Sequence, residues 1–234
     1  MKKTFIFVFL FLLASTITNS EEVEEGNIVL CGGGPIPVEV FKWVVDHKPL
    51  GKCLLISQHN AITNKWLHLK ELGQDIELIG LEELTVEKLK GVGAILLDGG
   101  SQYEYITKMN AEAIQMAHNS GVLILGTSAG AMILGEFYFS AQHGSISSEE
   151  ACANPNEERI CIGSRYVKIG CLRNHLIDSH YRDRQREGRL KVFIKKAGPD
   201  VKGIGIDESN ALCITSKGKE VIGGDGVHYM KQGE

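Results

Sequence analysis

Short apolar runs alternate with amphipathic segments through the first half of the chain. The runs that predict buried strands lie at 28–31, 53–57, 76–79, 94–97 and 122–125. The segments that predict helices lie at 38–46, 62–72, 86–90 and 103–117. Nearly continuous apolar strands that alternate with helices are typical of a parallel sheet covered on both faces. This pattern predicts an α/β fold with three layers and a mostly parallel, flavodoxin-like sheet.

The pattern changes after Leu134. Residues 137–164 read as a polar, irregular excursion, and loops of this length in compact domains are usually functional or mobile. A further apolar run ends at Asp178-Ser179-His180-Tyr181, and a helical spacing of apolar residues follows it. Glycine turns divide 203–230 into short strands, which complete the sheet or add an antiparallel β-hairpin. No linker divides residues 21–234, so one catalytic domain is expected.

The first 20 residues have the features of a signal peptide. Lys2-Lys3 precede an apolar run at 5–14, and small and polar residues then lead to a cleavage site near Ser20. The run is too short to span a bilayer comfortably, and no second stretch of that kind follows. The sequence therefore predicts a secreted or periplasmic protein with no stable membrane association after cleavage.

Charge and cysteine content narrow the classes further. The chain has 25 basic and 29 acidic residues, and loss of Lys2 and Lys3 with the leader leaves a net charge of −6. A nucleic-acid partner is not expected, because such binders carry a basic surplus. Export permits disulfides, and Cys152 and Cys161 in the polar excursion are the best candidates for pairing. No cysteine or histidine spacing indicates a metal, and no cofactor is expected.

The strongest chemical signal is Gly126-Thr127-Ser128-Ala129-Gly130-Ala131, directly after the apolar run at 122–125. A serine between small residues at a sharp strand-to-helix turn is the G-x-S-x-G nucleophile elbow, which indicates a hydrolase with a covalent serine intermediate. The same pattern also arises by chance in glycine-rich loops. The strand before it and the helix-compatible segment after it favour the elbow.

A serine nucleophile needs a base, and His180 is the best of the eight histidines because it ends an apolar run as Ser128 does. A carboxylate should orient that imidazole. Glu149, Glu150 and Asp178 are the candidates, and each also has an ordinary structural interpretation.

Ligand sites in open α/β sheets lie at the carboxyl ends of the strands. The backbone N–H groups of Ala129 and Gly100 are therefore candidate oxyanion donors. Four arginines, at 182, 184, 186 and 189, follow His180 closely and suit a substrate with acidic groups, or else a solvated helix face.

Together these motifs resemble the cyanophycinase-like serine peptidases, which are relatives of the aspartyl dipeptidases. The resemblance rests on the serine elbow, on Asp178-Ser179-His180-Tyr181, on the arginine segment 184–190 and on Gly203-Ile204-Gly205-Ile206-Asp207-Glu208. It covers most of the chain after the leader, from residue 28 to about residue 229. It implies a sheet of the class I glutamine-amidotransferase type. This chain departs from the family in carrying extra residues between Ser128 and His180, in the region of Cys152 and Cys161.

The resemblance also implies roles for individual residues. Ser128 would be the nucleophile and His180 the general base, with Glu150 favoured as the orienting acid. Gly100 and Ala129 would form the oxyanion hole. The residues implied for substrate binding are Gln102, Asp178, Arg184, Arg186 and Arg189.

The substrate expected from this family is an acidic, aspartyl-containing peptide or a cyanophycin-like polymer, cleaved beside aspartyl residues through an acyl-enzyme. An esterase is the alternative within the hydrolases, although Gly32-Gly33-Gly34 lacks the preceding histidine of an HGGG segment. A binding module without chemistry is the alternative outside the enzymes. A homodimer is compatible with the sequence.

Overall fold

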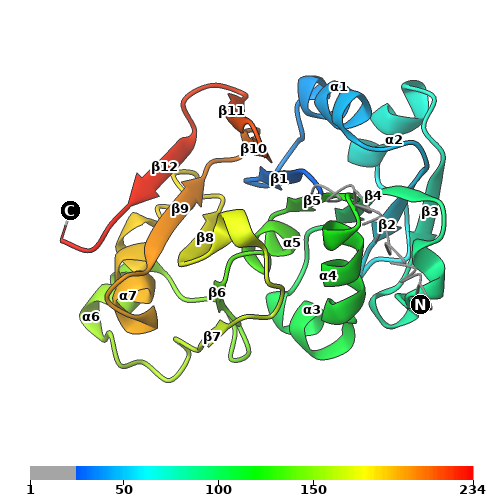
Figure 1. The fold of residues 1–234 in the computed structure, drawn as a ribbon. Coiled ribbons are helices and arrows are strands. Elements are labelled where there is room, and N and C mark those ends of the chain that lie inside the picture. The colour runs from blue at the N-terminus through cyan, green and yellow to red at the C-terminus, as the bar shows by residue number, and fades with distance from the viewer. Residues whose placement is uncertain (1–24, 234) are drawn as a thin grey trace, which may run out of the picture.

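The computed structural model of the protein describes residues 25–233, so the predicted leader at 1–20 lies outside the described residues. Its strands form two sheets, one of seven and one of five strands (Figure 1). Among the described residues, no helix combines the length and apolar character needed to cross a membrane.

The seven-stranded sheet has the order β11-β10-β1-β5-β4-β2-β3. Five of its strands run parallel to one another: β1 (Ile28–Cys31), β2 (Lys52–Ile56), β3 (Ile76–Ile79), β4 (Val92–Leu97) and β5 (Leu123–Thr127). The hairpin of β10 (Ala211–Thr215) and β11 (Gly218–Ile222) adds antiparallel to β1. The mostly parallel α/β fold and its C-terminal hairpin are therefore confirmed.

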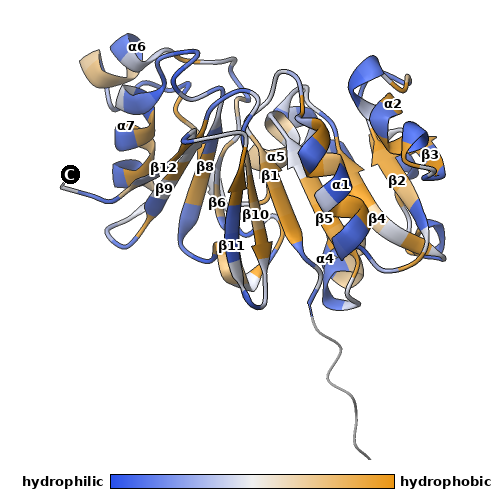
Figure 2. Cartoon of the chain, turned by 90° about the horizontal axis from the view of Figure 1, so that it is seen from above, coloured by the Kyte–Doolittle hydropathy of each residue, from blue (hydrophilic) through white to orange (hydrophobic). Residues whose placement is uncertain are grey.

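Helices cover both faces of this sheet, which gives the expected three layers. On one face lie α1 (Val38–His47) and α2 (Asn64–Glu71), and on the other α3 (Gln102–Lys108) and α4 (Ala111–Asn119). Side chains of β1 alternate between the two cores, with Leu30 in one and Val29 in the other. Figure 2 shows the apolar strands between helices whose outward sides are polar.

Two predicted helices differ from the structure. The segment predicted at 103–117 is two helices, because the side chain of Asn110 accepts the Ala113 N–H and begins α4. The segment predicted at 86–90 is reduced to a single 3₁₀ turn at Glu87–Leu89. A similar 3₁₀ turn occupies Leu81–Glu83.

The five-stranded sheet has the order β12-β9-β8-β6-β7 and was not predicted as a separate sheet. It contains β6 (Phe137–Phe139), β7 (Ile162–Ser164), β8 (His175–Ser179), β9 (Lys202–Ile206) and β12 (Val227–Met230). The polar excursion at 137–164 thus supplies two short strands and α6 (Ser148–Ala153). A 3₁₀ turn at Gly170–Leu172 precedes β8.

A third core cluster lies between the second sheet and α7 (Glu187–Ala197). Leu190, Phe193 and Ile194 are buried there as their spacing predicted, and the ring of Phe193 stacks on Phe139 at 4.6 Å between centroids. All six cysteines are free, so the pairing expected for Cys152 or Cys161 is not seen.

The short helix α5 (Ala129–Met132) connects the two sheets, because it packs against both β5 and β8. The C-terminal ends of β5 and β8 therefore lie close together. This junction holds the two residues that the sequence singled out most strongly.

Candidate active site

Ser128 lies at a strained turn between β5 and α5. Its backbone has φ 53° and ψ −118°, a conformation that a residue with a side chain rarely adopts. The flanking glycines leave no room for a side chain: a Cβ at residue 130 would lie 2.4 Å from the carbonyl oxygen of Leu97. This is the geometry expected of a nucleophile elbow.

His180 reaches Ser128 from the second sheet. Ser128 Oγ lies 2.8 Å from His180 Nε2, although 52 positions separate the two residues. The N–H of His180 donates to the carbonyl of Gly32 at 2.7 Å, and the imidazole packs so closely on Gly33 that a Cβ there would lie 2.3 Å from Cε1. The glycine segment after β1 therefore holds the imidazole in place.

Glu208 occupies the other side of the imidazole. His180 Nδ1 is hydrogen-bonded to Glu208 Oε1, so that Ser128, His180 and Glu208 form one continuous row. Sequence reasoning quoted Glu208 within a family motif but gave it no role. The sequence held half of the signal, because Glu208 lies just past the strand β9; the pairing of β9 with β8 is seen only in the structure.

The structure corrects the expectation that Glu150 orients His180. Glu150 accepts the N–H of Ser147 at 2.9 Å, and Ser147 Oγ accepts the N–H of Glu150 at 3.1 Å. This is the reciprocal capping box that begins α6. The Ser147 N–H and an ion pair with Arg159 at 2.8 Å lower the pKa of Glu150 to about 2. Its neighbour Glu149 is exposed.

Asp178, the third carboxylate considered, is committed to two arginines. Asp178 is 0% exposed and accepts two bonds from the Arg189 guanidinium, at 2.7 Å and 2.5 Å. Arg186 Nη1 lies 3.2 Å from the same carboxylate and donates to the carbonyl of Ser179 at 2.8 Å. Three residues expected to bind substrate therefore form a buried ion cluster behind the site.

Arg189 extends that cluster into the polar excursion. Its guanidinium donates to the carbonyl of Ile146 at 3.0 Å and lies over the rings of Phe139 and Phe193, 5.7 and 5.5 Å from their centroids. The cluster therefore ties α7, β8 and the loop before α6 together.

Arg184 differs from the other arginines that follow His180. Arg182, Arg186 and Arg189 each pair with an aspartate, whereas Arg184 has no ion pair within residues 25–233. Arg184 is exposed, and its N–H donates to the carbonyl of His180 at 3.0 Å. Among the described residues it is therefore an unpaired cation beside the row.

The surroundings of His180 favour the neutral form of its imidazole. Burial lowers the pKa of His180 below its ordinary value, and the charges of Arg184 and Arg186 lower it further. The hydrogen bond to Glu208 opposes this shift. A neutral imidazole with a free lone pair on Nε2 can accept the proton of Ser128.

Two backbone N–H groups near Ser128 are available as donors. Within residues 25–233, neither Ala129 nor Gly100 donates its N–H to a protein acceptor. The loop that carries Gly100 abuts the serine, since a Cβ at Gly99 would lie 3.5 Å from Ser128 Cβ. Gln102, expected to line the substrate pocket, is instead buried, and its amide contacts Met132 Sδ at 3.3 Å.

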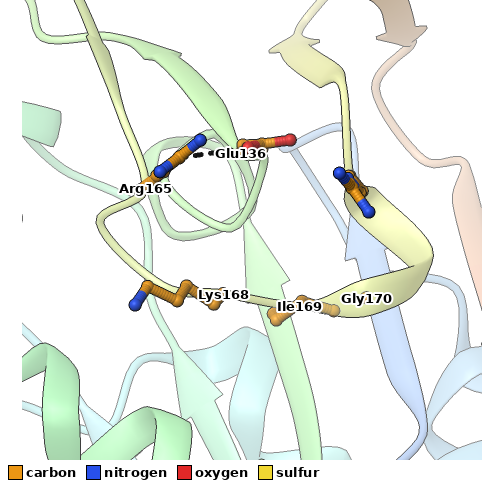
Figure 3. Close-up of a pocket in the computed structure, with 6 residues that line it drawn as sticks. Glu136, Arg165, Lys168, Ile169 and Gly170 are labelled. Atoms are coloured by element: carbon orange, nitrogen blue, oxygen red, sulfur yellow. Dashed lines mark ion pairs between the residues drawn. The ribbon is translucent and has the colours of Figure 1, made fainter.

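One cavity lies beside the row of Ser128, His180 and Glu208, and another lies apart from it. One of about 740 Å³ is lined by Gly34 and by the start of α2, and Gly34 also packs against the Glu208 side chain. A separate one of about 330 Å³ contains Glu136, Arg165 and Lys168 and none of the row (Figure 3). There Arg165 points toward Glu136, at 3.4 Å, while the Lys168 amine points away. Within the part of the chain described, no cluster of potential metal ligands occurs.

A serine on a strand-to-helix elbow, bonded to a histidine that a carboxylate orients, is the arrangement that defines serine hydrolases. The model of peptidase family S51 matches residues 57–222. The chain belongs to this family of serine-type peptidases, which confirms the resemblance noted from the motifs.

Individual relatives agree with this assignment. The chain is 32% identical over 154 residues to the cyanophycinase of Synechococcus elongatus, and 29% identical over 135 residues to that of Nostoc sp.. The first match covers 62% of this chain and 44% of the relative, and the second covers 56% and 42%. The chain thus spans less than half the length of these curated relatives.

Two solved structures share the fold. A peptidase from an acI-B1 Actinobacterium has a TM-score of 0.60 at 18% identity, over 91% of this chain and 97% of that one. A putative peptidase E protein from Listeria monocytogenes has a TM-score of 0.57 at 19% identity, over 84% and 98%.

The buried cluster behind the site gives a stability prediction. Asp178→Ala should lower the free energy of unfolding by about 3–5 kcal/mol, because it leaves buried guanidinium groups without a counter-charge. Urea unfolding measures the loss. Asp225→Ala is the control, since Asp225 is 95% exposed in its pair with Arg182 and its removal should leave stability unchanged. Equal losses of stability in the two variants would contradict the assignment of Asp178 to a buried, stabilising ion cluster.

Proposed function

We propose that this protein is an exported serine peptidase that hydrolyses peptide or isopeptide bonds next to aspartyl residues. The observation that carries the proposal is the continuous row of Ser128, His180 and Glu208 at the junction of the two sheets. Family membership and the cyanophycinase relatives support the reaction class. The leader-like residues 1–20 support export.

The three residues of the row can carry out every proton transfer that acyl transfer requires. Ser128 Oγ attacks the scissile carbonyl while its proton passes to His180 Nε2, and Glu208 stabilises the imidazolium that forms. The N–H groups of Ala129 and Gly100 donate to the oxyanion. His180 then returns the proton to the leaving amine. A water molecule, deprotonated by the same Nε2, hydrolyses the acyl-enzyme and frees Ser128.

Arg184 is the residue proposed to select acidic substrates. Of the four arginines at 182, 184, 186 and 189, it is the one that no carboxylate among residues 25–233 neutralises, and it lies on the turn that begins at His180. A substrate carboxylate could form the bidentate pair that Arg184 lacks within the protein. The proposal gives Arg184 alone the role that the resemblance implies for Arg184, Arg186 and Arg189.

The first prediction from the proposed function concerns the reaction itself. The protein is incubated with cyanophycin, β-Asp-Arg and a panel of Asp-X dipeptides, and the products are identified by mass spectrometry. Ser128→Ala should fold normally and lose several orders of magnitude in turnover. Full activity of the Ser128→Ala variant would exclude the proposed nucleophile. Turnover of p-nitrophenyl esters without any peptide would instead indicate an esterase, and peptide binding without labelling of Ser128 by a serine-directed phosphonate would indicate a binding module.

A second prediction distinguishes the two glutamates. Glu208→Gln should reduce kcat by about 10³-fold, because the amide neither fixes the imidazole tautomer nor stabilises the imidazolium. Glu150→Gln should leave kcat unchanged, because that side chain caps α6. Steady-state kinetics of both variants decide the matter. The reverse ranking would return Glu150 to the orienting role.

A third prediction concerns Arg184. Arg184→Gln should lower kcat/KM for acidic dipeptides by about 10- to 100-fold, as expected for loss of a charged hydrogen bond, and change neutral substrates little. It should also move the acidic limb of kcat/KM to higher pH. The reason is that Arg184 lowers the pKa of His180, so its removal lets the imidazole bind a proton more readily. Equal losses for acidic and neutral substrates would argue against selection by charge.

A further inference from the structure

The turns that carry His180 and Glu208 begin where two parallel strands end. Strands β8 and β9 pair in register as far as Ser179 and Ile206. One further backbone bond, from the N–H of Tyr181 to the carbonyl of Ile206 at 3.1 Å, continues the pairing. Beyond this point side chains hold the two turns together.

Two carboxylates make that connection reciprocally. Asp207 Oδ1, on the glutamate turn, accepts the backbone N–H of Arg182 at 2.8 Å. Asp183 Oδ2, on the histidine turn, accepts the backbone N–H of Glu208 itself at 2.7 Å. On each turn, a carboxylate thus accepts a hydrogen bond from a backbone N–H of the other turn.

We infer that Asp183 and Asp207 are positioning residues, a carboxylate clasp that holds the turn of Glu208 against the turn of His180. The inference rests on the proposed function, because it concerns how the orienting acid of that reaction is held. Neither aspartate touches the reacting atoms; both act through the backbone.

The clasp matters because the position of the Glu208 side chain follows from the position of its backbone. Its side chain is 33% exposed and has several rotatable bonds. The imidazole is fixed by contacts with Gly32 and Gly33, so the distance between His180 and Glu208 depends on where the backbone of residue 208 lies. The neighbouring residues Asp207 and Ser209 donate their N–H groups to the carbonyls of Gly226 and Gly33. Asp183 joins residue 208 itself to the histidine turn, since its carboxylate accepts the Glu208 N–H.

The two aspartates differ in how cleanly they can be tested. Asp207 is 6% exposed and also accepts bonds from Arg182 Nε at 2.5 Å and from His228 Nε2 at 3.0 Å, so its loss would disturb the fold. Asp183 is exposed, and within residues 25–233 the hydrogen bond that its side chain accepts comes from the Glu208 N–H. Asp183 is therefore the residue to change.

The kinetic test compares three variants on a dipeptide that the wild-type protein hydrolyses. Asp183→Ala should reduce kcat by about 10- to 100-fold with KM within twofold, as expected for a misplaced catalytic group. Asp183→Asn should recover most of the activity, because the amide oxygen still accepts the Glu208 N–H. Asp225→Ala also removes one negative charge, that of the exposed aspartate paired with Arg182, and its kinetics should be indistinguishable from those of the wild type. The Asn variant shares the charge change of the Ala variant, so it separates the hydrogen bond from simple electrostatics.

A spectroscopic readout does not depend on turnover. The proton on His180 Nδ1, shared with a carboxylate, should give a low-field ¹H NMR signal in wild type that is lost in Glu208→Gln. The same signal should weaken in Asp183→Ala and persist in Asp183→Asn and Asp225→Ala.

Wild-type kcat, or an unchanged signal, in Asp183→Ala would overturn the clasp, as would equal losses in the Asn and Ala variants. Failure of the proposed function is distinct: no peptide would be cleaved, or Ser128→Ala would retain activity. The NMR signal would still decide the clasp in that case.

Discussion

The position of one imidazole determines the whole site. His180 must contact a serine from one sheet and a glutamate from its own, and the glycine segment after β1 makes this possible. Gly32 accepts the N–H of His180, and Gly33 offers a surface without a Cβ against which the ring packs. Close packing of this kind leaves the ring little freedom, which is the physical basis of preorganisation. The same three glycines were considered from the sequence as an incomplete oxyanion segment, whereas in the structure Gly32 and Gly33 contact His180 and Gly34 lies against the Glu208 side chain.

The acidic residues near the site divide into two environments with different consequences. Asp178 is completely buried, and two arginines compensate its charge, so it contributes to the packing of α7 and the excursion onto β8. Glu208 is partly exposed and has the imidazole as its partner. A carboxylate surrounded by permanent cations is a poor partner for a histidine, because the guanidinium groups already occupy its lone pairs. The buried cluster therefore excludes Asp178 from the orienting role while it stabilises the elements that present His180.

The sequence predicted the parts of the structure that local chemistry decides. The five parallel strands follow from their apolar runs, and the elbow and His180 follow from polar residues at strand ends. Glu208 was missed because its role depends on β8 and β9 being neighbours, which no local pattern reports. Glu150 was favoured by the family resemblance, yet Ser147-Ser148-Glu149-Glu150 carries the S-x-x-E signature of a helix start. The second sheet was missed because two of its strands are three residues long and lie in polar surroundings.

The arrangement across two sheets also explains why α5 matters beyond its four residues. Ser128 precedes this helix, and Met132 at its other end contacts both Ser179, on β8, and Gln102, at the start of α3. The helix that begins at the nucleophile is thus packed against the strand that delivers the base. A shift of one sheet relative to the other would separate Ser128 from His180 only if α5 lost its contact with β8 or β5. Buried side chains such as Met132 resist small displacements. The packing of α5 in the core therefore fixes the position of Ser128 relative to His180.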